Sequence, residues 1–333
     1  ARLICKKHPN VQIIMKLFAF AMLSLVPSVT VCSVFSKEVD IYSGTYGNDD
    51  VEVFQPEEVM YHLAGRDGVF YEGAFTFDNY NPDKGGAGNR QGVFSGYSTH
   101  FSSTEGTSLG FHCTGLNPGK NSSASKSFIF VMGPWESGEE FVAPQVTFQN
   151  LGDLSFIADN MDMIGITDGA TAGTGGGRYG KADIVSFNNV GNIEFRGLNH
   201  GGIGFSRLNS LAFTNTGDIS FTDMKMGYSS NGGAIFINQG GNSSLYSNPG
   251  DGNISFDHTG SIIFRNLVKT SYYMSSAGIF TNEGSISFND TENILFENNT
   301  STGGPAAIGI GSIFLPDNQP SLSFSNIRGD IIF

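Results

Sequence analysis

Phenylalanine recurs in pairs, and the spacing of these pairs constrains the fold more than any other feature of the chain. Five pairs have their members eight residues apart: Phe148 and Phe156, Phe187 and Phe195, Phe213 and Phe221, Phe256 and Phe264, Phe288 and Phe296. A sixth pair, Phe324 and Phe333, is nine apart. Successive first phenylalanines are separated by 39, 26, 43, 32 and 36 residues. A unit that recurs at such intervals is typical of repeat architectures.

Each pair lies in two short segments with strand character. Apolar residues alternate with polar ones, as in Ile254 and Phe256, and the β-branched and aromatic residues favour strands. Asn, Asp or Gly closes each segment, and these residues form tight turns. A third apolar segment lies between successive pairs, beginning at Gly201, Gly232, Ser276 and Pro305. Three strands per turn predict an all-β fold, a right-handed parallel β-helix over residues 144–333.

Inside such a rod the phenylalanines are expected to stack in columns. Many of them are followed two residues later by asparagine, and we expect these asparagines to form a hydrogen-bonded ladder along one corner. Residues 34–143 lack the eight-residue spacing. They contain segments of alternating polarity, at 50–54 and 127–132, among many Gly, Ser and Tyr residues. We interpret this region as a β-rich N-terminal cap or as an irregular start of the same rod.

The N-terminus indicates export. Met15 and Lys16 precede an apolar run over 17–26, followed by small polar residues, which is the pattern of a secretory signal peptide. The run is too short to cross a bilayer, which needs about 20 apolar residues. We predict a signal peptide over 15–33, cleaved after Ser33 or Ser36, with residues 1–14 upstream of the natural start. Cys32 raises a lipoprotein alternative, but the residues before it match a lipobox poorly.

Composition excludes several classes of protein. The chain has 18 Lys and Arg against 31 Asp and Glu, a formal charge of −13, which disfavours nucleic acid as a partner. Three cysteines do not form a disulfide-dense scaffold. The six histidines do not cluster, and no residues stand at metal-ligand spacing. We therefore predict no metal and no cofactor.

Two short motifs then suggest a family. Gly232, Gly233, Ala234 and Ile235 form a GGAI sequence, and Phe296 is followed by Asn299 in a Phe-x-x-Asn sequence. Their alternation through six repeats behind a signal peptide resembles the passengers of the chlamydial polymorphic membrane proteins, which are autotransporters. The resemblance covers about residues 144–333 and is weak over 37–143. It implies surface display, outer-membrane association and adhesion to host cells, with these two motifs taking part.

The chain departs from that family at its end. Family members are longer and finish in a middle domain and an outer-membrane β-barrel, whereas this sequence ends within a repeat at Phe333. We therefore expect a passenger without its translocator, as a truncated or frame-shifted product would be. Such a chain reaches the cell surface or stays in the periplasm. An open end of the rod also offers unpaired strands, which predicts self-association.

Catalytic motifs find little support in the sequence. Gly106-Thr107-Ser108-Leu109-Gly110 matches a nucleophile elbow, but no helical segment follows it. Asp159, Asp162 and Asp168 are the nearest candidates for the paired carboxylates of a β-helix enzyme acting on polysaccharides. We interpret them as solvated loop charges and predict no catalytic residue. The Arg328-Gly329-Asp330 sequence is a speculative integrin-type contact.

Three hypotheses of function follow. The first is a non-catalytic, adhesin-like passenger that binds an unidentified host-cell surface protein, with insertions such as 239–243 and 272–276 making contacts. The second is a non-functional truncated passenger retained in the periplasm. The third is a polysaccharide-degrading enzyme. We favour the first because the repeats build a long surface and the sequence offers no convincing catalytic set.

Overall fold

The structure is a computed structural model that describes most of the repeat region and part of the N-terminal region. The described residues are 37–42, 45–46, 52–64, 75–77, 91–104, 106–113, 126–131, 145–161, 163–167, 182–205, 208–226, 233–237, 252–270, 275–282, 284–311 and 320–333. The predicted signal peptide and upstream segment lie outside them. Every regular element within these residues is a β-strand.

The chain winds round a rod in successive coils, and each coil contributes one strand to each of three sides. One coil contains β8 (Gln145–Leu151), β9 (Leu154–Met161) and β10 (Met163–Thr167), and the next contains β11 (Ala182–Val190), β12 (Ile193–Leu198) and β13 (Gly201–Phe205). Strands on the same side pair in parallel: β8 with β11, β9 with β12, and β10 with β13. The predicted parallel β-helix is confirmed.

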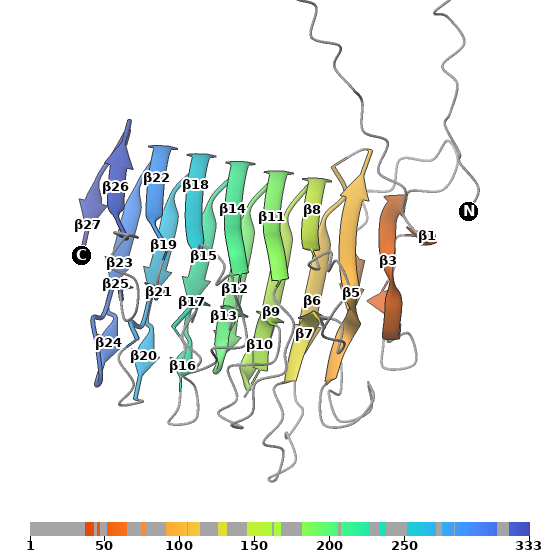
Figure 1. Ribbon diagram of the computed structural model, residues 1–333, viewed down its shortest axis with the longest axis horizontal. Helices are drawn as coiled ribbons and strands as arrows, with labels where there is room; N and C mark the ends of the chain where they lie inside the picture. The colour runs from red at the N-terminus through yellow and green to blue at the C-terminus, as the bar shows by residue number, and fades with distance from the viewer. Residues whose placement is uncertain are drawn as a thin grey trace, which may run out of the picture.

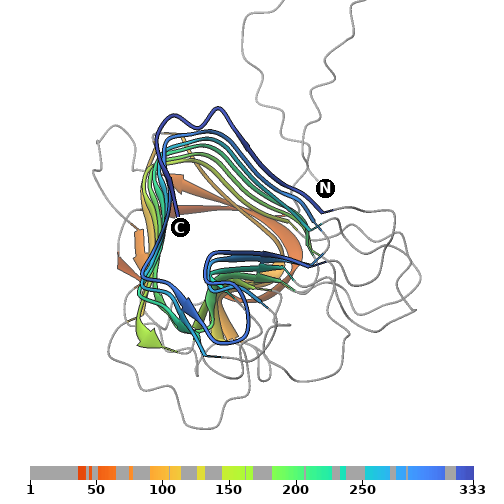
Figure 2. The same ribbon diagram turned by 90° about the vertical axis from the view of Figure 1, so that its left-hand side faces the viewer.

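Later coils repeat this arrangement and add a short strand between the second and third sides. Their strands are β14 (Leu208–Thr216), β15 (Ile219–Thr222), β16 (Lys225–Met226) and β17 (Ile235–Ile237); β18 (Asn253–Thr259), β19 (Ile262–Arg265), β20 (Val268–Lys269) and β21 (Ile279–Thr281); β22 (Ile286–Thr291), β23 (Ile294–Glu297), β24 (Thr300–Ser301) and β25 (Ile308–Ile310); and β26 (Leu322–Ser325) and β27 (Ile331–Ile332). Figure 1 shows the coils side by side along the long axis, and Figure 2 shows them superimposed along it.

The N-terminal strands join the same sheets. They are β1 (Lys37–Tyr42), β2 (Thr45–Tyr46), β3 (Glu52–Ala64), β4 (Phe75–Phe77), β5 (Gln91–Ser103), β6 (Leu109–Cys113) and β7 (Lys126–Val131). β1, β3 and β5 continue the side of β8, while β2, β4 and β6 continue the side of β9. Of the two interpretations of residues 34–143, these strands fit an irregular start of the same rod.

Two columns of stacked phenylalanines fill the rod. The first column runs through Phe101, Phe148, Phe187, Phe213, Phe256, Phe288 and Phe324, and the second through Phe111, Phe156, Phe195, Phe221, Phe264, Phe296 and Phe333. Neighbouring ring centroids lie 4.6 to 5.4 Å apart, with interplanar angles of at most 10°. Burial of one such ring contributes about 1.5–3 kcal/mol, so the columns dominate the favourable terms of folding.

The first pair in the columns was not predicted. Phe101 and Phe111 are ten residues apart, not eight, because a longer corner separates β5 from β6 than separates the corresponding strands of the regular coils. Both side chains are nevertheless fully buried. Both rings therefore keep their places in the two columns although their spacing along the chain differs.

Candidate binding surface

The asparagine of the Phe-x-Asn repeat makes the corner between the first and second sides. Six corner residues have left-handed backbones, with φ between 49° and 56°: Asn150, Asn189, Asn215, His258, Asp290 and Asn326. Each lies two residues after a phenylalanine of the first column. Asn and Asp adopt this conformation more readily than other residues that carry a Cβ. The repeat therefore encodes a buried ring followed by a sharp turn.

The predicted asparagine ladder is discontinuous at this position. Asn189 Nδ2 donates to Asn150 Oδ1 at 2.9 Å, and in the second corner Asn266 Nδ2 donates to Asp223 Oδ1 at 2.8 Å. A longer ladder runs three residues further along the first corner, through other side chains. There Asp153, Asn192 and Asp218 each accept, through Oδ1, the backbone N–H of the equivalent residue in the next coil, at 2.7 to 3.0 Å.

The Phe-x-x-Asn motif holds two coils together. Phe296 is 5% exposed and stacks in the second column. Asn299 Oδ1 accepts the backbone N–H of Leu267 at 3.0 Å, and its Nδ2 donates to the carbonyl oxygen of Phe264 at 2.9 Å. Both bonds reach the preceding coil. The motif therefore combines a core ring with an asparagine that satisfies backbone groups of the neighbouring turn.

The GGAI motif lies on the third side, where there is room only for small residues. Gly232 is outside the described residues. A Cβ on Gly233 would meet the carbonyl oxygens of Ser276 and Gly278, the latter at 2.8 Å. Ala234 and Ile235 are fully buried, and the backbone N–H of Ala234 donates to Ala277 at 2.9 Å. This motif therefore also determines how closely neighbouring coils pack.

The Arg-Gly-Asp sequence forms the first corner of the last described coil. The backbone N–H of Arg328 donates to Thr291 at 2.9 Å, and its Nη2 donates to the carbonyl oxygen of Thr259 at 3.2 Å. The backbone N–H of Asp330 donates to Asn293 Oδ1 at 2.9 Å. The Asp330 side chain is exposed. The arginine is thus engaged with its own rod, whereas the aspartate carboxylate faces solvent.

The carboxylates singled out for an enzyme are mostly outside the structure. Asp162 and Asp168 are not among the described residues, and Asp159 is described only as part of β9. Among the residues whose side chains the structure describes, no three His, Cys, Asp or Glu gather to hold a metal ion. In the Gly106–Gly110 string, Ser108 Oγ accepts the backbone N–H of Asp153 at 2.9 Å, and strand β6 begins at Leu109.

A chain of ionisable side chains along the first corner was missed by sequence reasoning. His258 Nδ1 lies 3.0 Å from Asp257 Oδ1, and its Nε2 lies 3.3 Å from Asp290 Oδ2. Arg328 Nε lies 3.4 Å from Asp290 Oδ1. These groups come from three successive coils, so only the register of stacking brings them together. They are largely exposed, and such pairs contribute about 0–1 kcal/mol each.

The outer surface of the first side carries few charged residues. We call it the hydroxyl–amide face and define it by two rows of outward side chains: Thr147, Ser186, Ala212, Ser255, Ser287 and Ser323; and Gln149, Asn188, Thr214, Asp257, Asn289 and Ser325. Asp257 is the one ionisable residue in these two rows. Neighbouring members lie in adjacent parallel strands, about 4.8 Å apart. The face therefore offers hydrogen-bonding groups at a regular repeat.

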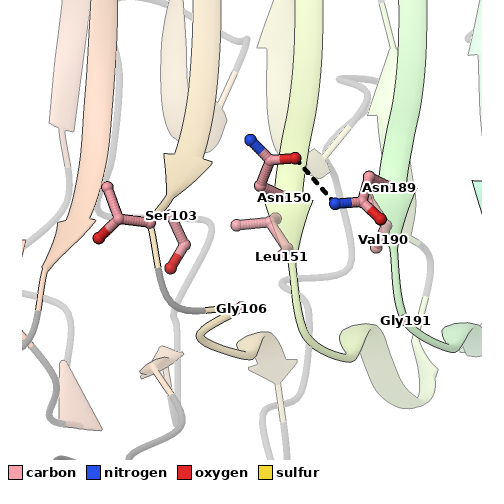
Figure 3. A pocket seen from close by; sticks show the side chains of 8 residues that line it. Ser103, Gly106, Asn150, Leu151, Asn189, Val190 and Gly191 are labelled. Carbon is pink, nitrogen blue, oxygen red and sulfur yellow. Dashed lines mark hydrogen bonds between the residues drawn. The ribbon is translucent and has the colours of Figure 1, made fainter.

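A groove of about 680 Å³ opens beside this face, on the first corner. We call it the corner groove; it is lined by Ser103, Thr104, Gly106, Asn150, Leu151, Asn189, Val190 and Gly191. Its lining residues come from the long corner between β5 and β6 and from the equivalent corners of the next two coils. Figure 3 shows the bonded amides of Asn150 and Asn189 side by side at this groove.

One of the two predicted contact insertions, 272–276, lies partly within the described residues. Residues 239–243 and 272–274 lie outside the described residues. Ser275 and Ser276 are 2% and 0% exposed, so the prediction that they make surface contacts is wrong. Both precede β21 on the third side, whose strands are buried on both faces.

Comparison with protein-family models, curated proteins and solved structures finds no match to this chain. The part of the chain that the structure describes contains no helix long and apolar enough to cross a membrane.

Proposed function

We propose that this protein is an exported, adhesin-like passenger that binds a host-cell surface protein without catalysis. The observation that carries the proposal is the division of roles in the rod. The motif residues Phe296, Asn299, Gly233 and Ala234 face or join neighbouring coils, while the hydroxyl–amide face stands open over six coils. In this proposal the outer surface of the rod binds the partner. The motif residues contribute indirectly, because they hold neighbouring coils together.

The hydroxyl–amide face suits a protein partner. Six coils at about 4.8 Å extend some 25–30 Å along the rod, a span of the size that stable protein interfaces need. The side chains are short, so little conformational entropy is lost when they are covered. Hydroxyl and amide groups both donate and accept, which allows them to match the polar rim of a partner.

The test is binding of the purified protein to host cells. Ser186→Arg with Ser255→Arg places two long cations on the hydroxyl–amide face and should abolish binding. Ser220→Arg is the matched control, because Ser220 is a similarly half-buried serine that points outward from β15 on the second side. Equal binding of the double variant and the control would refute this face as the contact.

Export and surface display are separate parts of the proposal. They rest on the signal-peptide pattern over 15–33 and on the family resemblance. Protease treatment of intact cells, followed by detection with an antibody to residues 144–333, should remove the protein. Protection that disappears only when the outer membrane is opened would instead support the alternative, a passenger retained in the periplasm.

A further inference from the structure

An apolar row interrupts the polar outer surface of the second side. In each strand of this side, the residue just before the column phenylalanine points outward. In three successive strands this residue is polar: Ser155, Glu194 and Ser220. In β19 and β23 it is Ile263 and Leu295, which are half-buried between fully or almost fully buried neighbours. Single exposed apolar residues are common on protein surfaces, but two in paired strands form a continuous patch.

An ion pair lies beside this patch, on the same two strands. Arg265 Nε is 2.6 Å from Glu297 Oε2. Each of the two residues stands two positions after the apolar residue of its own strand, so it points to the same side, about 7 Å further along the strand. Both side chains are partly exposed, at 45% and 34%. A guanidinium has five N–H donors and a carboxylate accepts several hydrogen bonds, so each group can bind a second partner from solvent.

The four side chains form a surface that is complementary to itself. A two-fold axis parallel to the strands and midway between β19 and β23 exchanges the two coils. It places Ile263 of one molecule opposite Leu295 of the other, and Arg265 opposite Glu297. An axis along the rod does not exchange the coils, and it places no opposite charge over Arg265 or Glu297. The complementarity therefore specifies one arrangement, with the two rods antiparallel.

Strand addition does not compete for this patch. Extended peptides commonly bind by pairing with a free strand edge. β19 already pairs with β15 and β23, and β23 pairs with β19 and β27. An occupant must therefore pack on the face of the sheet, as a second sheet does at a distance of about 10 Å.

We propose that two copies of this chain associate face to face through the second side, with Ile263, Leu295, Arg265 and Glu297 at the contact. The patch is narrow, so the dimer is weak and reversible. The hydroxyl–amide face lies on the first side of the rod and stays uncovered in each copy. Association does not depend on the proposed adhesion, and each copy keeps its own binding surface.

The first test is sedimentation equilibrium of the purified protein over a wide range of concentrations, which should show monomer and dimer. Ile263→Lys with Leu295→Lys places like charges opposite each other and should raise the dissociation constant about tenfold or more. Ser255→Lys is the matched control, because Ser255 is a half-buried outward residue of the same coil as Ile263 but on the first side. It should leave the dissociation constant unchanged, and melting temperatures should establish that all variants fold.

The second test exchanges the charges. Arg265→Glu and Glu297→Arg should each weaken association when studied alone, because the two-fold axis then brings like charges together. An equimolar mixture of the two variants should form heterodimers, since every carboxylate then faces a guanidinium. A mixture that associates no better than either variant alone would overturn the arrangement.

Two further results would overturn the proposal. One is a parent protein that stays monomeric at high concentration, and the other is a double lysine variant that dimerises as tightly as the parent. Loss of host-cell binding in the double lysine variant of a monomeric parent would instead assign this face to a different protein partner.

Discussion

The side-chain amide of Asn299 donates to the carbonyl oxygen of Phe264, one coil away, at 2.9 Å. Its oxygen accepts the N–H of Leu267 in the same preceding coil. In that coil the equivalent position is Leu267 itself, which is fully buried. An asparagine therefore replaces a core leucine here, and it does so with its hydrogen bonds satisfied. The role of the motif residue is to join coils.

Asn299→Ala should destabilise the protein. The variant removes both side-chain hydrogen bonds and leaves the partly buried backbone groups of Phe264 and Leu267 without these partners, which costs about 1–3 kcal/mol. Urea unfolding measures the change. Asn298→Gly is the control, because Asn298 is exposed with φ 54°, and glycine adopts this conformation freely. Equal stability of Asn299→Ala and the parent protein would contradict this role.

Lys269 should make the free energy of unfolding depend on pH in the alkaline range. It is 1% exposed and takes the place of Met226 of the preceding coil, and burial lowers its pKa from the ordinary value of about 10.4. Between the lowered pKa and about 10.4, the unfolded chain binds more protons than the folded one, so the free energy of unfolding should rise with pH across that window.

Lys269→Met should be more stable than the parent protein at neutral pH and should lose this alkaline rise. Methionine matches the residue that packs at this position one coil earlier, Met226, which is fully buried. Thermal unfolding between pH 7 and 11 provides the comparison. A parent protein whose stability stays flat or falls over that range would disprove the penalty assigned to the buried ammonium group.

Asp330→Glu should leave both folding and host-cell binding unchanged. The corner uses the backbone of Asp330, whose N–H donates to Asn293 Oδ1 and whose carbonyl accepts from Ile294. The side chain therefore adds little to stability. An integrin contact, in contrast, requires the carboxylate at its native length, so loss of cell binding in a fully folded Asp330→Glu variant would establish the Arg-Gly-Asp sequence as a binding site.

The sequence was sufficient for the repeating part of the fold because the pattern there has few exceptions. Phenylalanines eight residues apart place two rings in two columns, and the asparagine after each first ring marks the corner. Register then follows, since each ring stacks on the equivalent ring of the next coil, as Phe187 does on Phe213 at 4.6 Å.

The start of the rod escaped sequence analysis for two reasons. Tyr61 stands in register with Phe101, so the preceding strand has tyrosine, not phenylalanine, at this position of the sequence. β5 also runs without a break from one side to the next, pairing with β7 over its first half and with β8 over its second. Neither feature leaves an eight-residue spacing in the sequence.

The candidate sites consist of residues that are far apart in the sequence and close together only in the folded rod. The corner groove is lined partly by a corner that is longer than its neighbours, and its two amides come from residues 39 apart in the sequence. The contact between His258 and Asp290 likewise requires the stacking of coils 32 residues apart. Such sites become visible only when the register of every coil is known.

The most direct test of the account is Phe296→Ala, followed by parallel measurement of unfolding and host-cell binding. Phe296 stacks between Phe264 and Phe333, at 4.8 and 5.4 Å, and its loss should cost about 3–5 kcal/mol. We predict that stability and binding fall together, because the motif holds the rod that presents the binding surface. Loss of binding with an unchanged unfolding midpoint would show that the motif itself is the contact, and would contradict the account.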